Sequence, residues 1–161
     1  WMARAMNERL PSPPDGCDAW PLWAWQRWTD QGAPDPSDDE YAEQDLWLVA
    51  FDIPKIDVLL SCFERWHYCL NGWYLPDTGG VDGGEAEGER FSLELERSGI
   101  NWHDRPYPQP FWDRVTDSWS KIFVVKEGDC DVQATFWQMR LDQVVSEVPA
   151  GRLISQIKNK Y

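Results

Sequence analysis

The sequence predicts an α+β domain: a small mixed or antiparallel sheet with short helices and a tryptophan-rich core. Segments with strand-like patterning do not alternate regularly with helix-like segments, which argues against a doubly wound parallel fold. Twelve of the 161 residues are tryptophan and 14% are aromatic, so large rings must supply much of the buried surface. A chain of this length is expected to form one domain over residues 1–161.

The most informative stretch is Leu59–Leu75, which reads LLSCFERWHYCLNGWYL. Ser61 and Glu64 are spaced as a capping box, which predicts a helix that begins at Cys62. The Asn71-Gly72 pair is suited to a left-handed helix end. One face of this helix should carry four residues at positions i, i+3, i+4 and i+7: Phe63, Trp66, His67 and Leu70.

Residues 1–10 match the end of a helix, with apolar side chains at helical spacing before Pro11. A domain rarely begins inside such a pattern, so we expect that an N-terminal segment of the domain precedes Trp1. Residues 76–90 contain five glycines and five acidic residues and predict a flexible, acidic loop. Residues 153–161 form a basic tail.

Four further segments have strand-like patterns, and two have helical ones. The run at Asp45–Ile53 is almost continuously apolar, which predicts a strand buried on both faces. The other predicted strands are Cys17–Thr29, Ile122–Val125 and Val132–Leu141. Short helical segments are expected at Phe111–Trp119 and Asp142–Val148.

The net charge of −13 argues against partners that are bound by neutralising phosphates. Duplex nucleic acid and anionic membranes are therefore disfavoured. The sequence has no signal peptide and no apolar run of membrane-spanning length, and its four cysteines are consistent with a reduced, cytoplasmic location.

His67 is the first candidate for acid–base chemistry, because imidazole titrates near neutrality and the neighbouring rings of Trp66, Tyr68 and Trp73 would shield it. The alternative is a core histidine bonded to a backbone carbonyl. Asn71 is a second polar group on the same helix.

The spacing of the potential ligands predicts no metal site. Zinc would have to draw on Cys62, His67, Cys69, His103 and Cys130, and none of these is spaced as CxxC or HxxxH. The cysteines are expected to act as small buried apolar groups. The sequence identifies no cofactor.

The tryptophan cluster at Trp20–Trp28 could stack against a planar ligand, with the Arg27 guanidinium at its edge. The alternative is core packing, which we expect for Trp23 and leave open for Trp25 and Trp28. Gln133, on the less hydrophobic side of a predicted strand, is either a site residue or an edge residue that meets solvent.

Four segments in order along the chain resemble a bacterial family catalogued as domain of unknown function 3841. The most specific part is WHYCLN at Trp66–Asn71. The segments are PLWAW at 21–25, LLSCFERWHYCLNGWY at 59–74, SWSKIF at 118–123 and QATFWQMRL at 133–141. Members of this family usually look longer at the front, and the family name implies no activity.

The order of an aromatic strand, a helix and a late strand that opens on a polar residue is also similar to small ADP-ribosyltransferase-like domains. That similarity implies an NAD pocket lined by His67 or the aromatic cluster, with Gln133 at the place of the usual catalytic glutamate. A glutamine cannot supply the carboxylate that such catalysis uses, and fold analogy is a weak argument for function.

The leading functional hypothesis is a binding domain for a small planar ligand or a peptide, held in an aromatic-lined cleft. Two alternatives stay open: an NAD-binding enzyme of the ADP-ribosyltransferase type, and a module that binds a protein of a host or mobile-element system. The expected ligand-binding residues are Trp23, Trp25, Arg27, Trp28, Trp66, Asn71 and Trp73, and the expected catalytic residues are His67 and Gln133.

Overall fold

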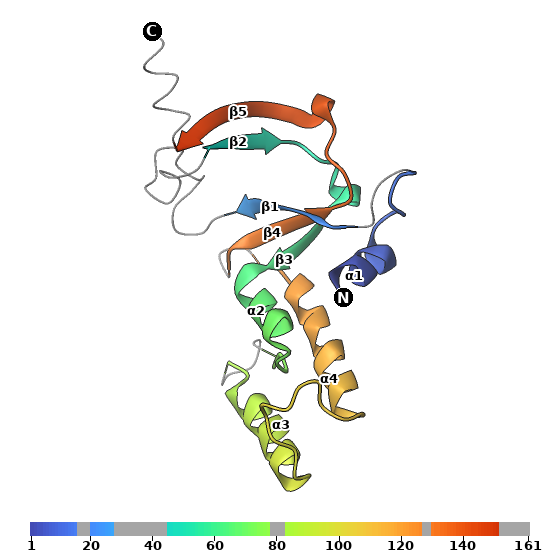
Figure 1. The fold of residues 1–161 in the computed structure, drawn as a ribbon, viewed down its shortest axis with the longest axis vertical. Coiled ribbons are helices and arrows are strands. Elements are labelled where there is room, and N and C mark those ends of the chain that lie inside the picture. Colours follow the sequence, from blue (N-terminus) through green and yellow to red (C-terminus); the bar gives the residue numbers. More distant parts are fainter. Residues whose placement is uncertain (16–19, 28–44, 78–82, 127–129, 152–161) are drawn as a thin grey trace. The chain divides into compact units, whose positions relative to one another are not determined.

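The computed structural model describes residues 1–15, 20–27, 45–77, 83–126 and 130–151 (Figure 1). Within these ranges the chain forms four α-helices and two small sheets, which confirms the predicted α+β class. The chain divides into two compact units. We call residues 1–59 with 134–161 the terminal unit, and residues 60–133 the central unit. None of the described helices is both long enough and apolar enough to cross a membrane.

The terminal unit contains helix α1 (Met2–Arg9) and a two-stranded antiparallel sheet. Met2, Ala5 and Met6 are buried, as the spacing of apolar residues predicts. In the sheet, strand β2 (Asp45–Phe51) pairs with strand β5 (Val144–Gly151), and the register shifts between Ala50 and Phe51. The Phe51 ring packs edge-on against Phe136, with centroids 5.4 Å apart.

The second sheet has the strand order β1-β4-β3. Its strands are β1 (Leu22–Arg27), β4 (Val132–Phe136) and β3 (Leu59–Cys62). Strands β3 and β4 contain the two positions, 59/60 and 133/134, at which the chain passes between the units. At this sheet the Thr135 hydroxyl is fully buried and donates to the carbonyl of Leu59 over 3.0 Å.

The central unit contains helices α2 (Phe63–Asn71), α3 (Glu85–Arg97) and α4 (Phe111–Ser118), and the 3₁₀ helix η3 (Trp119–Phe123). Seven of its core side chains come from these helices and from the connections between them: Leu75, Phe91, Leu95, Tyr107, Val115, Trp119 and Ile122. A smaller cluster of Cys62, Cys130 and Val132 packs against Leu60 and Val125.

Helix α2 starts differently from the prediction. It begins at Phe63, Cys62 is its N-cap residue, and no side-chain capping bond is present. Ser61 cannot cap the helix because it lies buried in strand β3. The predicted capping box is therefore wrong, whereas the helix end is as predicted: Gly72 adopts a left-handed conformation with φ of 64°.

Four other predictions of local structure are corrected. No strand forms at 122–125, where η3 covers the first two residues, and the expected helical turn at 142–148 is mostly strand β5. A short apolar run does not distinguish these structures. Strand β2 alternates between exposed and half-buried residues and so is not buried on both faces. Helix α3 begins at Glu85, inside the expected loop at 76–90. The prediction missed it because most of its residues are charged and only Phe91 and Leu95 form its buried face.

The fold is rich in aromatic residues, but the tryptophans differ widely in burial. Trp119 and Trp137 are buried, and each places its indole N–H on a backbone carbonyl: Trp119 on Trp73 at 2.7 Å and Trp137 on Pro11 at 3.2 Å. Such partners are what buried indoles require. Trp23 is 39% exposed, so its predicted core position is wrong.

Gly84 should be intolerant of substitution because it precedes α3 with a φ of 87°. An added Cβ would lie 2.8 Å from the Asp77 carbonyl oxygen and 3.0 Å from the Pro76 Cβ. We expect Gly84→Ala to lower the free energy of unfolding by about 2 kcal/mol or more, measured by urea denaturation.

Gly88→Ala is the matched control, because Gly88 lies inside α3 and its added Cβ would meet no atom within 4 Å. Alanine is the better helix former, so this variant should gain about 1 kcal/mol. Equal effects of the two substitutions would contradict this account of Gly84.

Candidate functional site

A cleft with a volume of about 1160 Å³ opens on the central unit. Its walls are helix α3, the segment after α2 and the turn at residues 99–107. The aromatic side chains that line it, apart from His103, are Tyr68, Trp73, Tyr74, Phe91, Trp102 and Tyr107. The size and the aromatic lining are those of a small-molecule site.

Helix α3 turns one acidic face toward the cleft. Glu85, Glu89, Ser92 and Glu96 follow each other at i, i+4, i+7 and i+11, which places them on one side of a helix. Gly88 lies on the same side and leaves open space where a side chain would stand. This face therefore offers carboxylates and a stretch of bare backbone.

The aromatic residues pack against each other in pairs. Tyr74 stacks on Phe91 with ring centroids 4.3 Å apart and an angle of 10° between the planes, whereas Tyr68 meets Trp73 edge-on at 6.0 Å. Trp102 packs against its neighbour His103 at 3.8 Å, yet 54% of Trp102 stays exposed. Trp73 is also partly exposed, at 40%, and the Arg105 guanidinium lies over one face of the Trp102 ring, 5.5 Å from its centroid.

The turn that carries Trp102 is tied by its own hydrogen bonds. The Tyr107 hydroxyl donates to the Trp102 carbonyl at 2.9 Å, and the His103 amide donates to the Asn101 side chain at 3.0 Å. The Asp104 amide also donates to the Asn101 carbonyl. These bonds fix the backbone from which the Trp102 ring extends.

The Glu87 carboxylate joins α3 to the segment after α2. It accepts hydrogen bonds from the Tyr74 hydroxyl and from the Asp77 amide, the latter at 2.5 Å. The Lys121 ammonium lies 3.4 Å from the same carboxylate and also donates to the Leu75 carbonyl at 3.1 Å. Three segments of the central unit therefore meet at one carboxylate.

The segment after α2 is held from its other side by α4 and η3. The Leu75 amide donates to the Ser118 hydroxyl at 2.9 Å, and that hydroxyl donates to the Val115 carbonyl at 2.6 Å. The Trp119 indole donates to the Trp73 carbonyl. The backbone that carries Trp73 and Tyr74 is thus fixed in position beside α3.

The Glu87 interactions change the acidity of both partners. The Tyr74 hydrogen bond, followed by the Asp77 amide and the Lys121 charge, lowers the pKa of Glu87. Burial, followed by the hydrogen bond to the Glu87 carboxylate, raises the pKa of Tyr74 to about 12. At neutral pH the pair is an ionised carboxylate and a neutral phenol.

The described lining of the cleft holds three carboxylates, Glu85, Glu89 and Glu96, and no lysine or arginine. His103 is the only basic side chain among the described lining residues. The cleft therefore presents π faces and negative charge together, which is the combination that attracts organic cations.

Residues 1–145 match the profile of the family described as domain of unknown function, DUF3841. The chain belongs to the DUF3841 family. No curated protein and no solved structure matches this DUF3841 chain. The family description assigns no function, so the chemistry of the site has to be argued from its own residues.

Most of the sequence-predicted site residues on α2 and just after it lie outside the cleft of this DUF3841 protein. Trp73 lines it, but Trp66, His67 and Asn71 do not. His67 is exposed, so the predicted shielding by neighbouring rings and the predicted core position are wrong. The bond to a backbone carbonyl is present, because Nδ1 lies 3.1 Å from the Phe63 carbonyl oxygen. The Asn71 side chain donates to the His67 carbonyl at 2.7 Å and serves the end of the helix.

The remaining predicted residues belong to other elements. Trp23, Trp25 and Arg27 lie on β1 in the terminal unit, and Trp28 lies outside the described residues. Gln133 is half-buried in β4, where its Oε1 is buried without a hydrogen-bond partner among the described residues, and it does not line the cleft.

The sequence analysis did not predict the cleft residues on α3 and in the 99–107 turn. The Trp102-His103 pair stands before a proline-rich run, and the acidic spacing of α3 is obscured by the glycines before and within it. The useful signal would have been the Phe91–Leu95 pair at i and i+4, which marks a helix in an otherwise polar segment.

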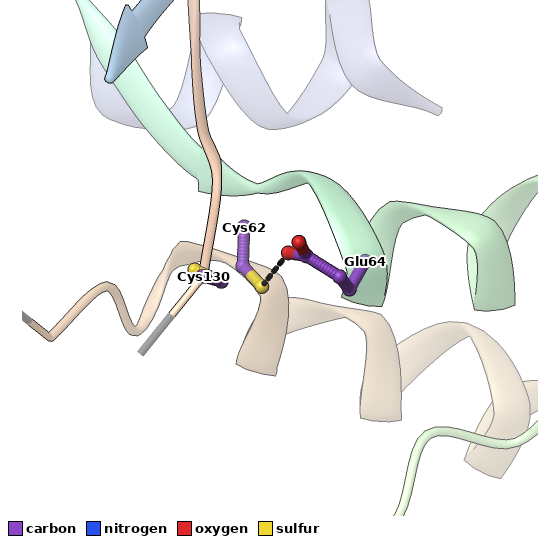
Figure 2. Close-up of side chains that lie close together, drawn as sticks. All are labelled: Cys62, Glu64 and Cys130. Atoms are coloured by element: carbon purple, nitrogen blue, oxygen red, sulfur yellow. Dashed lines mark hydrogen bonds between the residues drawn. The ribbon is translucent and has the colours of Figure 1, made fainter. Parts of the chain in front are cut away.

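One group of potential metal ligands forms in the described part of this DUF3841 chain, contrary to what the sequence spacing predicts. The sulfur atoms of Cys62 and Cys130 and a carboxylate oxygen of Glu64 lie within 4.8 Å of one another (Figure 2). Because residue 130 is remote from 62 and 64 along the chain, no ligand motif announces the group.

Glu87→Gln should destabilise the central unit, because it removes the charge that accepts from Tyr74 and Asp77 and faces Lys121. We expect a loss of about 1 to 3 kcal/mol at pH 7, measured by chemical denaturation. Glu89→Gln is the matched control: Glu89 is an exposed carboxylate on the same helix, and its replacement should leave stability nearly unchanged.

The difference between the wild-type protein and Glu87→Gln should depend on pH. Because folding lowers the pKa of Glu87, its stabilisation is complete above the ordinary carboxyl pKa of about 4.3 and is lost as the pH falls through the folded-state value. The gap in unfolding free energy should therefore shrink in acid. A gap that stays constant down to pH 2 would contradict the ionised Glu87 network.

Proposed function

We propose that the central unit binds a small planar organic cation in its aromatic cleft. The observation that carries the proposal is the lining itself: six aromatic rings and three carboxylates, without lysine or arginine among the described lining residues. A planar ring system would stack on the exposed faces of Trp73 and Trp102, and the acidic face of α3 would stabilise its charge.

The volume of the cleft supports a small molecule. About 1160 Å³ is slightly above the usual range for ligand sites, so a compound of two or three fused rings fits with space to spare. Hydrogen bonds of the Glu87 carboxylate and of the 99–107 turn also hold the walls of the cleft in position without a ligand. A site that needs little ordering loses less affinity on binding.

An NAD-binding enzyme receives less support. A diphosphate requires cationic or amide donors, and the cleft presents carboxylates instead. His67 and Gln133, the two residues that the ADP-ribosyltransferase analogy would use, are not part of its lining. We therefore prefer binding of a cation to turnover of NAD.

A protein-interaction module is a second candidate, favoured by exposed tryptophans in the terminal unit. Trp20 is 79% exposed, and Trp47 on β2 is also largely exposed. Large rings of this kind are common anchors of protein interfaces. This candidate uses different residues from the cleft, so substitutions separate the two.

Isothermal titration calorimetry with N-methylquinolinium tests the cleft. We expect saturable binding of the cation, weaker binding of the neutral, similarly sized 1-methylnaphthalene, and none of naphthalene-2-carboxylate. Trp102→Ala should weaken cation binding about three- to tenfold, the size of one cation–π contact. Trp47→Ala, which removes an exposed tryptophan of the terminal unit, is the control and should bind as the wild type does.

Equal binding of the three probes would contradict a cation site. Loss of binding in Trp47→Ala with full binding in Trp102→Ala would move the site to the terminal unit. Saturable binding of NAD at the expense of N-methylquinolinium would favour the enzyme alternative.

Gly88→Leu should abolish binding without harming the fold. The added side chain would enter the open space on the cleft side of α3, and leucine is a better helix former than glycine. We expect higher stability by urea denaturation together with loss of the calorimetric signal for N-methylquinolinium. Retained binding at wild-type affinity would show that the ligand does not occupy this part of the cleft.

A further inference from the structure

We propose that Cys62, Glu64 and Cys130 form a site for one thiolate-preferring divalent cation, of which Zn²⁺ is the most common in proteins. Two sulfur ligands and one carboxylate come together here, from the N-cap and first turn of α2 and from the residues just before β4 (Figure 2). The site lies in the central unit and shares no residue with the lining of the aromatic cleft.

The spacing of the ligand atoms suits a tetrahedral ion after small movements. All three atoms lie within 4.8 Å of one another, and the Cys62 thiol donates to the Glu64 carboxylate at 3.3 Å. Zinc–sulfur bonds of about 2.3 Å place two sulfurs about 3.8 Å apart. The present separations, none above 4.8 Å, are therefore close to those of a tetrahedral site.

The backbone already holds the two parts of the site together. The Phe63 amide donates to the Asp131 carbonyl at 2.9 Å, and the Asp131 amide donates to the second oxygen of Glu64 at 3.3 Å. These bonds join α2 to the residue that follows Cys130. An ion would therefore meet ligands that are already near each other, so that little chain ordering opposes binding.

The surroundings differ on the two sides of the group. Cys62 is 1% exposed and Cys130 is 5% exposed, and both pack with Val132, Leu60 and Val125. Glu64 is exposed, so the carboxylate lies at the solvent side. This arrangement gives three protein ligands and leaves the fourth position of a tetrahedral ion to water or to a further ligand.

Core packing alone explains two buried cysteines but does not require a carboxylate beside them. In the metal-free protein the Glu64 carboxylate accepts a hydrogen bond from the Cys62 thiol. On binding, the ion replaces the protons of both thiols, and two protons are released for each ion bound. The two thiolates and the Glu64 carboxylate then supply the negative charge that a divalent cation needs.

Cobalt titration of the full chain under reducing conditions tests the site. We expect one Co²⁺ per chain, a thiolate-to-cobalt absorption band in the near ultraviolet, and visible bands typical of a tetrahedral ion. Cys62→Ser and Cys130→Ser should each weaken the band strongly, and Glu64→Gln should lower the affinity while keeping the band. Cys69→Ser is the control, because Cys69 lies further along α2 and outside the group.

A second measurement uses the wild-type protein, so that it does not depend on how the variants fold. Zn²⁺ should slow alkylation of Cys62 and Cys130, read by mass spectrometry, and leave the alkylation of Cys69 unchanged. Equal alkylation rates with and without Zn²⁺ would overturn the proposal. So would a cobalt band that survives in both Cys62→Ser and Cys130→Ser, or a reduced chain that binds no ion and instead forms a Cys62–Cys130 disulfide with oxidised glutathione.

Discussion

The central unit depends on one half-buried carboxylate, that of Glu87. Helix α3 is mostly polar, and only Phe91 and Leu95 are buried on it, so apolar packing alone anchors it weakly. Glu87 adds a charge-assisted contact to Tyr74, to the Asp77 amide and to Lys121. Since hydrogen bonds to charged groups are stronger than neutral ones, this residue compensates for the small apolar face.

The other acidic residues of α3 then become available for different tasks. Glu94 pairs with Arg114, whose guanidinium also lies over the rings of Phe91, at 5.0 Å, and Phe111. Glu85, Glu89 and Glu96 line the cleft. The carboxylates of α3 therefore have three different roles: Glu87 anchors the helix, Glu94 forms an ion pair, and the other three line the cleft.

The sequence predicted the elements whose signal is local. The N-terminal helix, the α4 helix and the left-handed end of α2 at Gly72 follow from spacing and from the conformational freedom of glycine. It failed at the start of α2, because Ser61 belongs to β3 and Glu64 has other partners, Cys62 and the Asp131 amide. Those partners are set by tertiary structure, which the local pattern cannot contain.

The candidate sites were harder to predict for the same reason. Trp73, which the sequence analysis singled out just after α2, lines the cleft, but Trp102 joins it there only through the packing of α3 and the 99–107 turn. Cys62 and Cys130 lie near opposite ends of the central unit's sequence, so the spacing of ligands along the chain could not reveal the group. His67, the most conspicuous residue of the sequence, is an exposed helix residue bonded to its own backbone.

The central claim is that the Glu87-anchored cleft, and no other surface, receives a planar cation. Intermolecular nuclear Overhauser effects between N-methylquinolinium and the ¹³C-labelled protein test it most directly. The account predicts contacts from the N-methyl protons to the indole protons of Trp73 and Trp102. Contacts confined to Trp20, Trp23 or Trp47 of the terminal unit would contradict it.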